Sequence, residues 1–346
     1  MRTVRVTLAS VAVLCGLASL SEADDTIRLR PNGTVRGTIS AMTATEVSLD
    51  MAAGQKKQVP VNEIDTIVFE GEPPEIKLVR SEVANSNYEG ALKSLDKIDP
   101  AKVTRAEIKQ DLQFYKALCL ARLALAGTGK VGDAGIQMRA FVKDNPTNYH
   151  YLAAAEILGD LFATIGKPEL AYEQYTAVER APWPEAKMRG SVAKGRILVM
   201  QKKYPEALAA FDTVLKLAGD GKGPGATSRL AAQLGKATCL AATDQPDKAI
   251  ALVQEVIDNA DPEDVDLNGR AYLALGNCYR QKPAAIKDAR DAFLHVDLLY
   301  PSNREAHAEA LANLARIWNE LGKPERALQA TQLLKDRYAN SVWAKQ

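Results

Sequence analysis

The stretch Tyr272-Leu-Ala-Leu-Gly-Asn-Cys-Tyr279, followed by Ala289, Phe293 and Tyr300-Pro301, decides the fold of most of this chain. Its apolar residues recur every three or four positions on two successive segments, which is typical of amphipathic helices. The glycine allows the two helices to approach closely, and the aromatic side chains fill the space between them. The proline ends the second helix. The stretch therefore predicts a pair of packed helices.

Similar patterns recur along residues 73–346, where no strand pattern occurs. Each clear copy has an alanine near the start of its second helix, and successive alanines are separated by 36, 42, 40 and 38 residues. These alanines are Ala171, Ala207, Ala249, Ala289 and Ala327. Two degenerate copies lie upstream, one around Ala91 and one between Leu112 and Phe141. The chain therefore carries a repeated helix pair.

This pattern resembles the tetratricopeptide repeat, W-x2-L-G-x2-Y followed by A, F and P, with Tyr272 replacing the tryptophan. The resemblance covers about four-fifths of the chain and implies a mainly α fold, a solenoid of about six or seven helix pairs over residues 73–346. The standard repeat has about 34 residues, so the excess lies in longer helices or loops such as Gly219–Gly225. The endings Leu298–Asn303 and Asp336–Ser341 also resemble those of exported bacterial cell-envelope repeat proteins.

Residues 24–72 have the alternating pattern of β-strands instead. Turn sequences at Pro31-Asn-Gly33 and Ala53-Gly-Gln55 separate the strands. The expected strands are Thr26–Arg30, Thr34–Ser40, Glu46–Asp50, Lys57–Val61 and Asp65–Phe69. The segment resembles SH3-like or Sm-like small β-barrels, which implies a structural spacer or an oligomerisation module. Sm proteins bind RNA, but an aromatic and basic platform is not evident here.

Residues 1–23 have the composition of a secretory signal peptide. Arg2 and Arg5 precede the apolar stretch Val6–Leu20, and small residues stand at Ser21 and Ala23. We expect cleavage after Ala23, and we expect the mature protein to be periplasmic or secreted. The apolar stretch is shorter than the roughly 20 residues that span a bilayer. A lipid anchor on Cys15 is disfavoured because Leu14 stands where a small residue is required.

Charge and motifs argue against several classes of function. The chain has 44 basic and 43 acidic residues, and such a balance does not favour nucleic-acid binding. The remaining cysteines, Cys119, Cys239 and Cys278, lack a CxxC spacing and are expected to be buried on helices. The histidines, His150, His295 and His307, lack a metal-ligand spacing and are expected to be surface or packing residues. The segment Gly127–Val131 departs from a phosphate loop and is expected to be a turn between helices. We expect no catalytic site, no metal and no cofactor.

The resemblance to tetratricopeptide proteins implies a binding groove. In that family, residues of the first helix that follow its glycine or alanine mark, and others a turn or more before it, line a concave surface. Carried over, this selects as the main candidates Arg189, Arg196, Arg270, Asn277, Arg280, Arg316 and Asn319, with Asp160, Ala163, Val199, Thr238, Ala241 and Glu309 beside them. Arginine and asparagine suit the backbone or a carboxylate of an extended peptide, although the lysine and asparagine arrangement of the chaperone-binding carboxylate clamp is lacking.

Three functions follow as alternatives. The first is a non-enzymatic scaffold or adaptor of the periplasm or cell envelope that binds a protein or extended peptide, alone or as part of an envelope complex. The second is a self-associating structural protein, a homo-oligomer in which residues 24–72 are the oligomerisation module. The third is an enzyme or glycan-binding subunit whose site has no motif. A further alternative is that the groove is exposed to solvent and binds no specific partner.

Overall fold

The computed structural model describes residues 24–219, 225–339 and 341–345. The expected signal peptide, with Cys15, and most of the glycine-rich loop after Gly219 lie outside the described residues. In the described part, five strands precede fourteen α-helices. None of the helices in these residues is long and apolar enough to cross a membrane.

The five strands form one antiparallel sheet with the order β4-β3-β2-β1-β5. Their bounds are β1 (Asp25–Leu29), β2 (Thr34–Met42), β3 (Glu46–Asp50), β4 (Lys56–Pro60) and β5 (Ile64–Val68). Ile27 on the central part of β1 faces Val35 of β2 and Ile67 of β5. All three side chains are buried, because alternate residues of a strand point to the same face. The expected strands are therefore present, with ends that differ by two residues at most.

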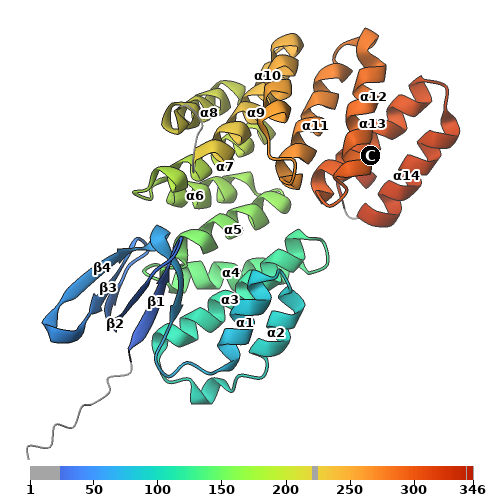
Figure 1. Cartoon of the computed structure of the whole chain (residues 1–346). Helices are drawn as coiled ribbons and strands as arrows, with labels where there is room; N and C mark the ends of the chain where they lie inside the picture. Colours follow the sequence, from blue (N-terminus) through green and yellow to red (C-terminus); the bar gives the residue numbers. More distant parts are fainter. Residues whose placement is uncertain (1–23, 220–224, 340, 346) are drawn as a thin grey trace, which may run out of the picture.

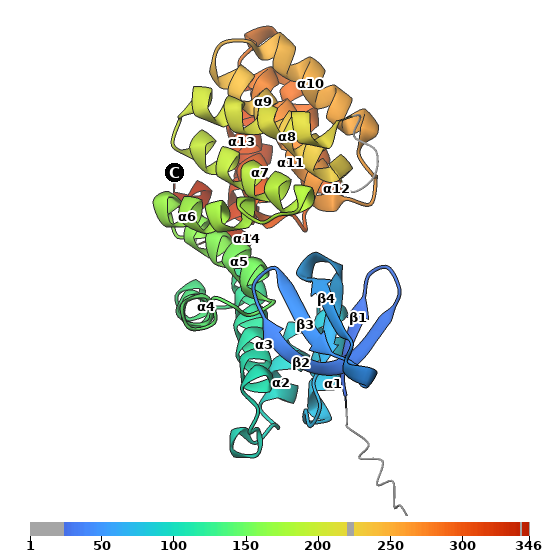
Figure 2. The same ribbon diagram turned by 90° about the vertical axis from the view of Figure 1, so that its left-hand side faces the viewer.

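The sheet does not have a hydrophobic core of its own. Ile27 and Phe69 belong to one cluster with Ile76 of α1 (Glu75–Ala84), Ile108 of α3 (Ala106–Leu125) and Tyr149. Figure 2 shows the sheet beside α3 and α5 (Tyr151–Thr164). Residue 72 thus separates strands from helices, but the apolar core continues across it.

A buried ion pair also joins the sheet to the helices. Asp25 accepts hydrogen bonds from both terminal nitrogens of Arg105, at 2.6 and 2.8 Å. It also accepts bonds from the amides of Ile39 and Glu70, each at 2.9 Å. Burial by itself raises the pKa of Asp25, but Arg105 and these amides outweigh it, so the pKa is lowered.

The helices form seven consecutive pairs. The remaining bounds are α2 (Tyr88–Leu95), α4 (Val131–Asp144), α6 (Pro168–Glu179), α7 (Pro184–Met200), α8 (Tyr204–Ala218), α9 (Ala226–Ala242), α10 (Pro246–Asn259), α11 (Val265–Arg280), α12 (Ile286–Leu299), α13 (Arg304–Glu320) and α14 (Pro324–Tyr338). Proline stands in the first turn of several helices, where no backbone donor is lost. Of the predicted turn Gly127–Val131, the first four residues connect α3 to α4, and Val131 begins α4.

The glycines of the repeat pattern, one in the first helix of a pair, allow the two helices to pack closely, as predicted. In three pairs, a glycine of the first helix lies under an aromatic ring of the second. These are Gly159 with Tyr175, Gly195 with Phe211 and Gly276 with Phe293. A Cβ atom at any of these glycines would lie 2.5 or 2.6 Å from a ring carbon, which is far inside van der Waals contact. The five marker alanines of the second helices are all buried.

The pairs follow one another along an arc (Figure 1). The first helices of the pairs, α3, α5, α7, α9, α11 and α13, form its inner face, and close contacts link α3 to α5, α7 to α9, α9 to α11 and α11 to α13. The second helices, such as α8, α10, α12 and α14, lie outside (Figure 1). The arc nearly closes, since a Cβ on Gly127, after α3, would lie 2.8 Å from the Arg304 guanidinium on α13.

Candidate functional site

The inner face gathers charges from helices that are far apart in sequence. Arg122 of α3, Arg196 of α7 and Arg270 of α11 all lie close enough to Asp160 of α5 to lower its pKa. Burial has the larger, opposite effect, so the pKa of Asp160 is raised overall. The Tyr175 hydroxyl donates a hydrogen bond to Asp160 at 2.7 Å. Three arginines therefore surround a single, half-buried carboxyl group.

Arg270 shows how concentrated this positive charge is. Burial, and next the charge of Arg196, lower the pKa of the Arg270 guanidinium, while Asp266 and Glu305 raise it. Its ion pair is with Asp266, one turn earlier on α11. A lowered pKa means that the site disfavours the cation relative to water, so an added anion would relieve an existing electrostatic cost.

The other candidates from the sequence have separate partners. Asn277 donates to Glu309 of α13 at 2.8 Å, and burial raises the pKa of Glu309. Arg280 pairs with Glu320 at 3.1 Å, which links α11 to α13. Arg316 and Asn319 are exposed on α13.

One expectation about the groove needs correction. Ala241 is buried in the core between α9 and α11, because the end of α9 turns this side chain toward the next pair. Arg189 is exposed on α7, seven residues before Arg196, and pairs with Glu156 of α5 at 3.2 Å. Thr238, by contrast, is exposed on α9.

Arg122 is not among the residues expected in the groove, although the sequence carries a signal for it. Ala121 is fully buried and stands 13 residues before Ala134 on α4, as Gly276 stands 13 before Ala289. Ala121 is thus the mark of this degenerate copy. Arg122 follows it in the same way that Arg196 follows Gly195.

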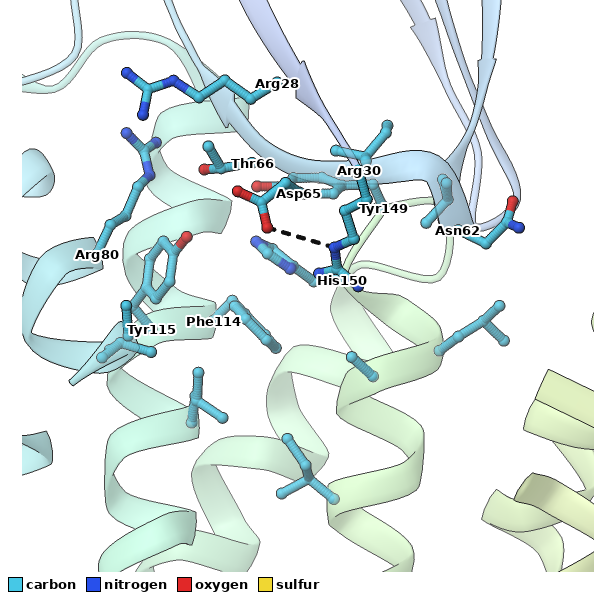
Figure 3. A pocket seen from close by; sticks show the side chains of 18 of the residues that line it. Arg28, Arg30, Asn62, Asp65, Thr66, Arg80, Phe114, Tyr115, Tyr149 and His150 are labelled. Carbon is cyan, nitrogen blue, oxygen red and sulfur yellow. Dashed lines mark hydrogen bonds and ion pairs between the residues drawn. The ribbon is translucent and has the colours of Figure 1, made fainter. Parts of the chain in front are cut away.

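A cleft of about 870 Å³ opens between the sheet and the helices. Its walls come from β1, β5, α1, α3, α5 and α7, and Arg122 and Arg189 of the array line it. Figure 3 shows Arg28, Asp65 and Thr66 of the sheet facing Phe114, Tyr115 and His150 of the helical side. Cavities of this size lie within the range of ligand sites, about 300–1,000 Å³.

Three residues that line the cleft, Arg80, Tyr149 and His150, are bonded to Asp111 of α3 behind them. This fully buried carboxylate accepts from Tyr149 at 2.9 Å and from Arg80 at 3.1 Å, and its distance to the Nε2 atom of His150 is also 3.1 Å. His150 stacks on Phe114 with 3.7 Å between ring centroids. Burial lowers the pKa of His150, which the bond to Asp111 partly offsets. His150 is thus a packed residue, as expected.

Arg80 also covers the outer edge of β5. It donates to the carbonyl oxygen of Ile67 at 2.7 Å and pairs with Glu72 at 2.6 Å. Glu72 in turn accepts from the amide of Phe69 at 3.1 Å. These bonds satisfy backbone groups that an edge strand otherwise leaves free for another strand.

The three cysteines and His307 are packed in the core, whereas His295 is exposed on α12 and stacks on Tyr272 with 4.5 Å between ring centroids. Cys119, Cys239 and Cys278 are buried, and burial raises the pKa of each thiol to about 11. His307 is buried between Tyr338 and Asp297. Among the residues that the structure describes, no group of three or more His, Cys, Asp or Glu side chains could hold a metal ion.

Comparisons with known proteins agree with the repeated pairs. Residues 158–226 and 192–265 match the family model of the Tetratricopeptide repeat. No curated protein matches the chain in sequence.

Solved structures show the same fold at low sequence identity. A tetratricopeptide repeat protein from Parabacteroides merdae is 18% identical, with a TM-score of 0.57 over 78% of this chain and 94% of that one. The Rap protein complexed with competence and sporulation factor is 16% identical, with a TM-score of 0.54 over 77% and 75%. The quorum sensor NprR from B. thuringiensis, in its apo form, is 16% identical, with a TM-score of 0.55 over 74% and 73%. The helices of this chain therefore have the fold of a tetratricopeptide repeat array.

Proposed function

We propose that this protein is an exported, non-enzymatic scaffold that binds a protein partner through an extended peptide on the inner face of the array. The observation that carries the proposal is the cluster of Arg122, Arg196 and Arg270 around Asp160. An array of helix pairs presents a long surface rather than a closed pocket. Tetratricopeptide repeats are in general interaction modules, and the related Rap structure contains a bound factor.

The chemistry of the inner face suits a peptide. Guanidinium groups donate paired hydrogen bonds to carboxylates and single bonds to backbone carbonyls. Asn277 can both donate to and accept from a peptide backbone, although its amide now bonds Glu309. Because the arc nearly closes, such bonds form where water is partly excluded, and this strengthens them.

Export rests on residues 1–23, with their two cations, apolar stretch and small residues before the expected cut. Cleavage after Ala23 would leave the fold intact, since β1 begins at Asp25. The full-length chain should be expressed in a bacterial host, fractionated and sequenced from its N-terminus. A periplasmic product that begins at Asp24 supports export, whereas an uncleaved cytoplasmic product contradicts it.

Peptide binding is tested by selection from a random library of displayed 12-residue peptides on the purified chain. Enriched peptides are then measured by fluorescence anisotropy against Arg196→Glu and against Lys216→Glu, an exposed residue of the outer helix α8. Hydrogen bonds to charged groups contribute about 1.5–3 kcal/mol, so we expect Arg196→Glu to weaken binding at least about tenfold. Equal affinities for both variants, or no enriched peptide, would refute the proposal.

Self-association remains the alternative. The last pair is partly covered by Trp343 and Ala344, which pack on its core, and part of the sheet is occupied by the helices. Light scattering that gives the mass of one chain at micromolar concentration would exclude this alternative.

A further inference from the structure

The cleft between the sheet and the array has a charge that its own side chains do not balance. It is lined by six cationic residues, Arg28, Arg30, Lys77, Arg80, Arg122 and Arg189, and by three carboxylates. Three of the cations are already paired, Arg30 with Asp65, Arg80 with Glu72 and the buried Asp111, and Arg189 with Glu156. The other three leave a local excess of positive charge in a chain whose formal charge is only +1.

Three of the cations are available for a ligand. Within the described ranges, no carboxylate lies within ion-pair distance of Arg28, Lys77 or Arg122, and all three are exposed. They come from β1, α1 and α3, so they stand on different walls of the cleft. Figure 3 shows Arg28 above the aromatic residues of α3. An anion between these walls would be attracted from several sides.

The cleft is also continuous with the inner face. Arg122 lines the cleft and is close enough to Asp160 to act on its pKa. Arg189 of α7 lines the cleft too. A chain that follows the inner face toward α3 therefore reaches the cleft without crossing the outer helices.

We propose that the cleft binds an acidic segment of the same extended peptide that occupies the inner face, with Arg28, Lys77 and Arg122 pairing its carboxylates. This deepens the proposed function and rests on it. The sheet is then a wall of the binding site and not a spacer. The mode is side-chain recognition and not strand addition, because Arg80 and Glu72 already cover the edge of β5.

The apolar walls favour a peptide over a bare polyanion. Phe114, Leu118, Ile157 and Trp183 line the same cleft, and they offer contacts for apolar side chains between the acidic ones. The chain as a whole carries almost no net charge, whereas proteins that bind nucleic acid gain affinity from every phosphate that they neutralise.

The test uses two fluorescent 12-residue probes, one of alternating Leu and Glu and one with Gln in place of every Glu. Their affinities are measured for the full chain, for Arg28→Glu with Lys77→Glu, and for a matched control. The control is Lys57→Glu with Lys93→Glu, two exposed lysines on β4 and α2 that do not line the cleft. Hydrogen exchange of each variant checks that the fold is intact.

We expect the acidic probe to bind more tightly than the neutral one, and the cleft variant to weaken it at least about tenfold at low salt. The control should change its affinity less than about threefold, and 0.5 M salt should reduce the difference, since exposed charges are screened. Equal binding of both probes, or equal affinities of the two variants, would overturn the inference. Displacement of the probe by an equally long single-stranded DNA would overturn the choice of a peptide.

These outcomes separate the two proposals. If Arg196→Glu weakens the peptides from the selection while the cleft variant has no effect on the acidic probe, the cleft inference fails and the proposed function stands. If no selected peptide responds to Arg196→Glu, the proposed function fails whatever the cleft variant does.

Discussion

Replacing Asp25 by alanine should detach the sheet from the helical array. The carboxylate is 1% exposed, and it accepts four hydrogen bonds, two from Arg105 and one each from the amides of Ile39 and Glu70. Removing one partner of a fully buried ion pair costs about 3–5 kcal/mol. Arg105 is 25% exposed and keeps a bond to Glu107, so we expect the lower end, about 3 kcal/mol.

Hydrogen exchange followed by mass spectrometry measures this cost locally, which matters because repeat arrays need not unfold in one step. A loss of about 3 kcal/mol corresponds to roughly hundredfold faster exchange in peptides that cover β1 and β5. The control is Asp50→Ala, since Asp50 forms an exposed pair with Lys56. Such pairs contribute about 0–1 kcal/mol.

The pH dependence supplies an independent check. The pKa of Asp25 is lowered in the folded chain, so its contribution to stability is complete above the unfolded pKa of aspartate, about 3.9. The contribution is lost as the pH falls through the folded pKa. Protection of β1 in the parent chain should therefore fall below about pH 4, and Asp25→Ala should show less of this fall. If Asp25→Ala and Asp50→Ala exchange at the same rate, the reasoning is wrong.

Three further results are expected. Gly195→Leu should destabilise the α7–α8 pair by at least about 1–3 kcal/mol in urea denaturation, because a Cβ there meets the Phe211 ring; a neutral effect would contradict this packing. Asp160→Asn should tighten binding of acidic peptides in anisotropy titrations, since it removes the carboxylate among the three arginines and leaves an oxygen for Tyr175; weaker binding would contradict the charge argument. The three core thiols should not react with a disulfide reagent at pH 8 until the protein is denatured, since burial raises the pKa of each to about 11; rapid native labelling would refute their burial.

The repeats and the strands could be predicted because their causes are local in sequence. A glycine must precede its aromatic partner by a nearly fixed number of residues, as Gly159 precedes Tyr175 and Gly195 precedes Phe211. Strand alternation is equally local, since every second residue faces the core. Helix pairs and sheet therefore have signals that one sequence carries by itself.

The connections between these elements have no such signal. Asp25 and Arg105 are 80 residues apart, and Arg80 and Asp111 are 31 apart. On sequence alone, each of these four residues could have been paired with any of the many other residues of opposite charge. The cleft and the core shared by sheet and helices depend on these pairs, so neither could be predicted. The sequence pattern selects Arg196 and Arg270 but not Arg122, and only the curvature of the arc brings all three close to Asp160.

Peptide binding on the inner face is tested most directly by photo-crosslinking. A benzoylphenylalanine is placed at Thr238, exposed on the inner helix α9, and in a second variant at Lys216 on the outer helix α8. Each variant is irradiated with a peptide from the display selection. A crosslink at position 238 that is absent at position 216 is the predicted result. A crosslink at 216 alone, or equal yields at both positions, would contradict binding along the inner face.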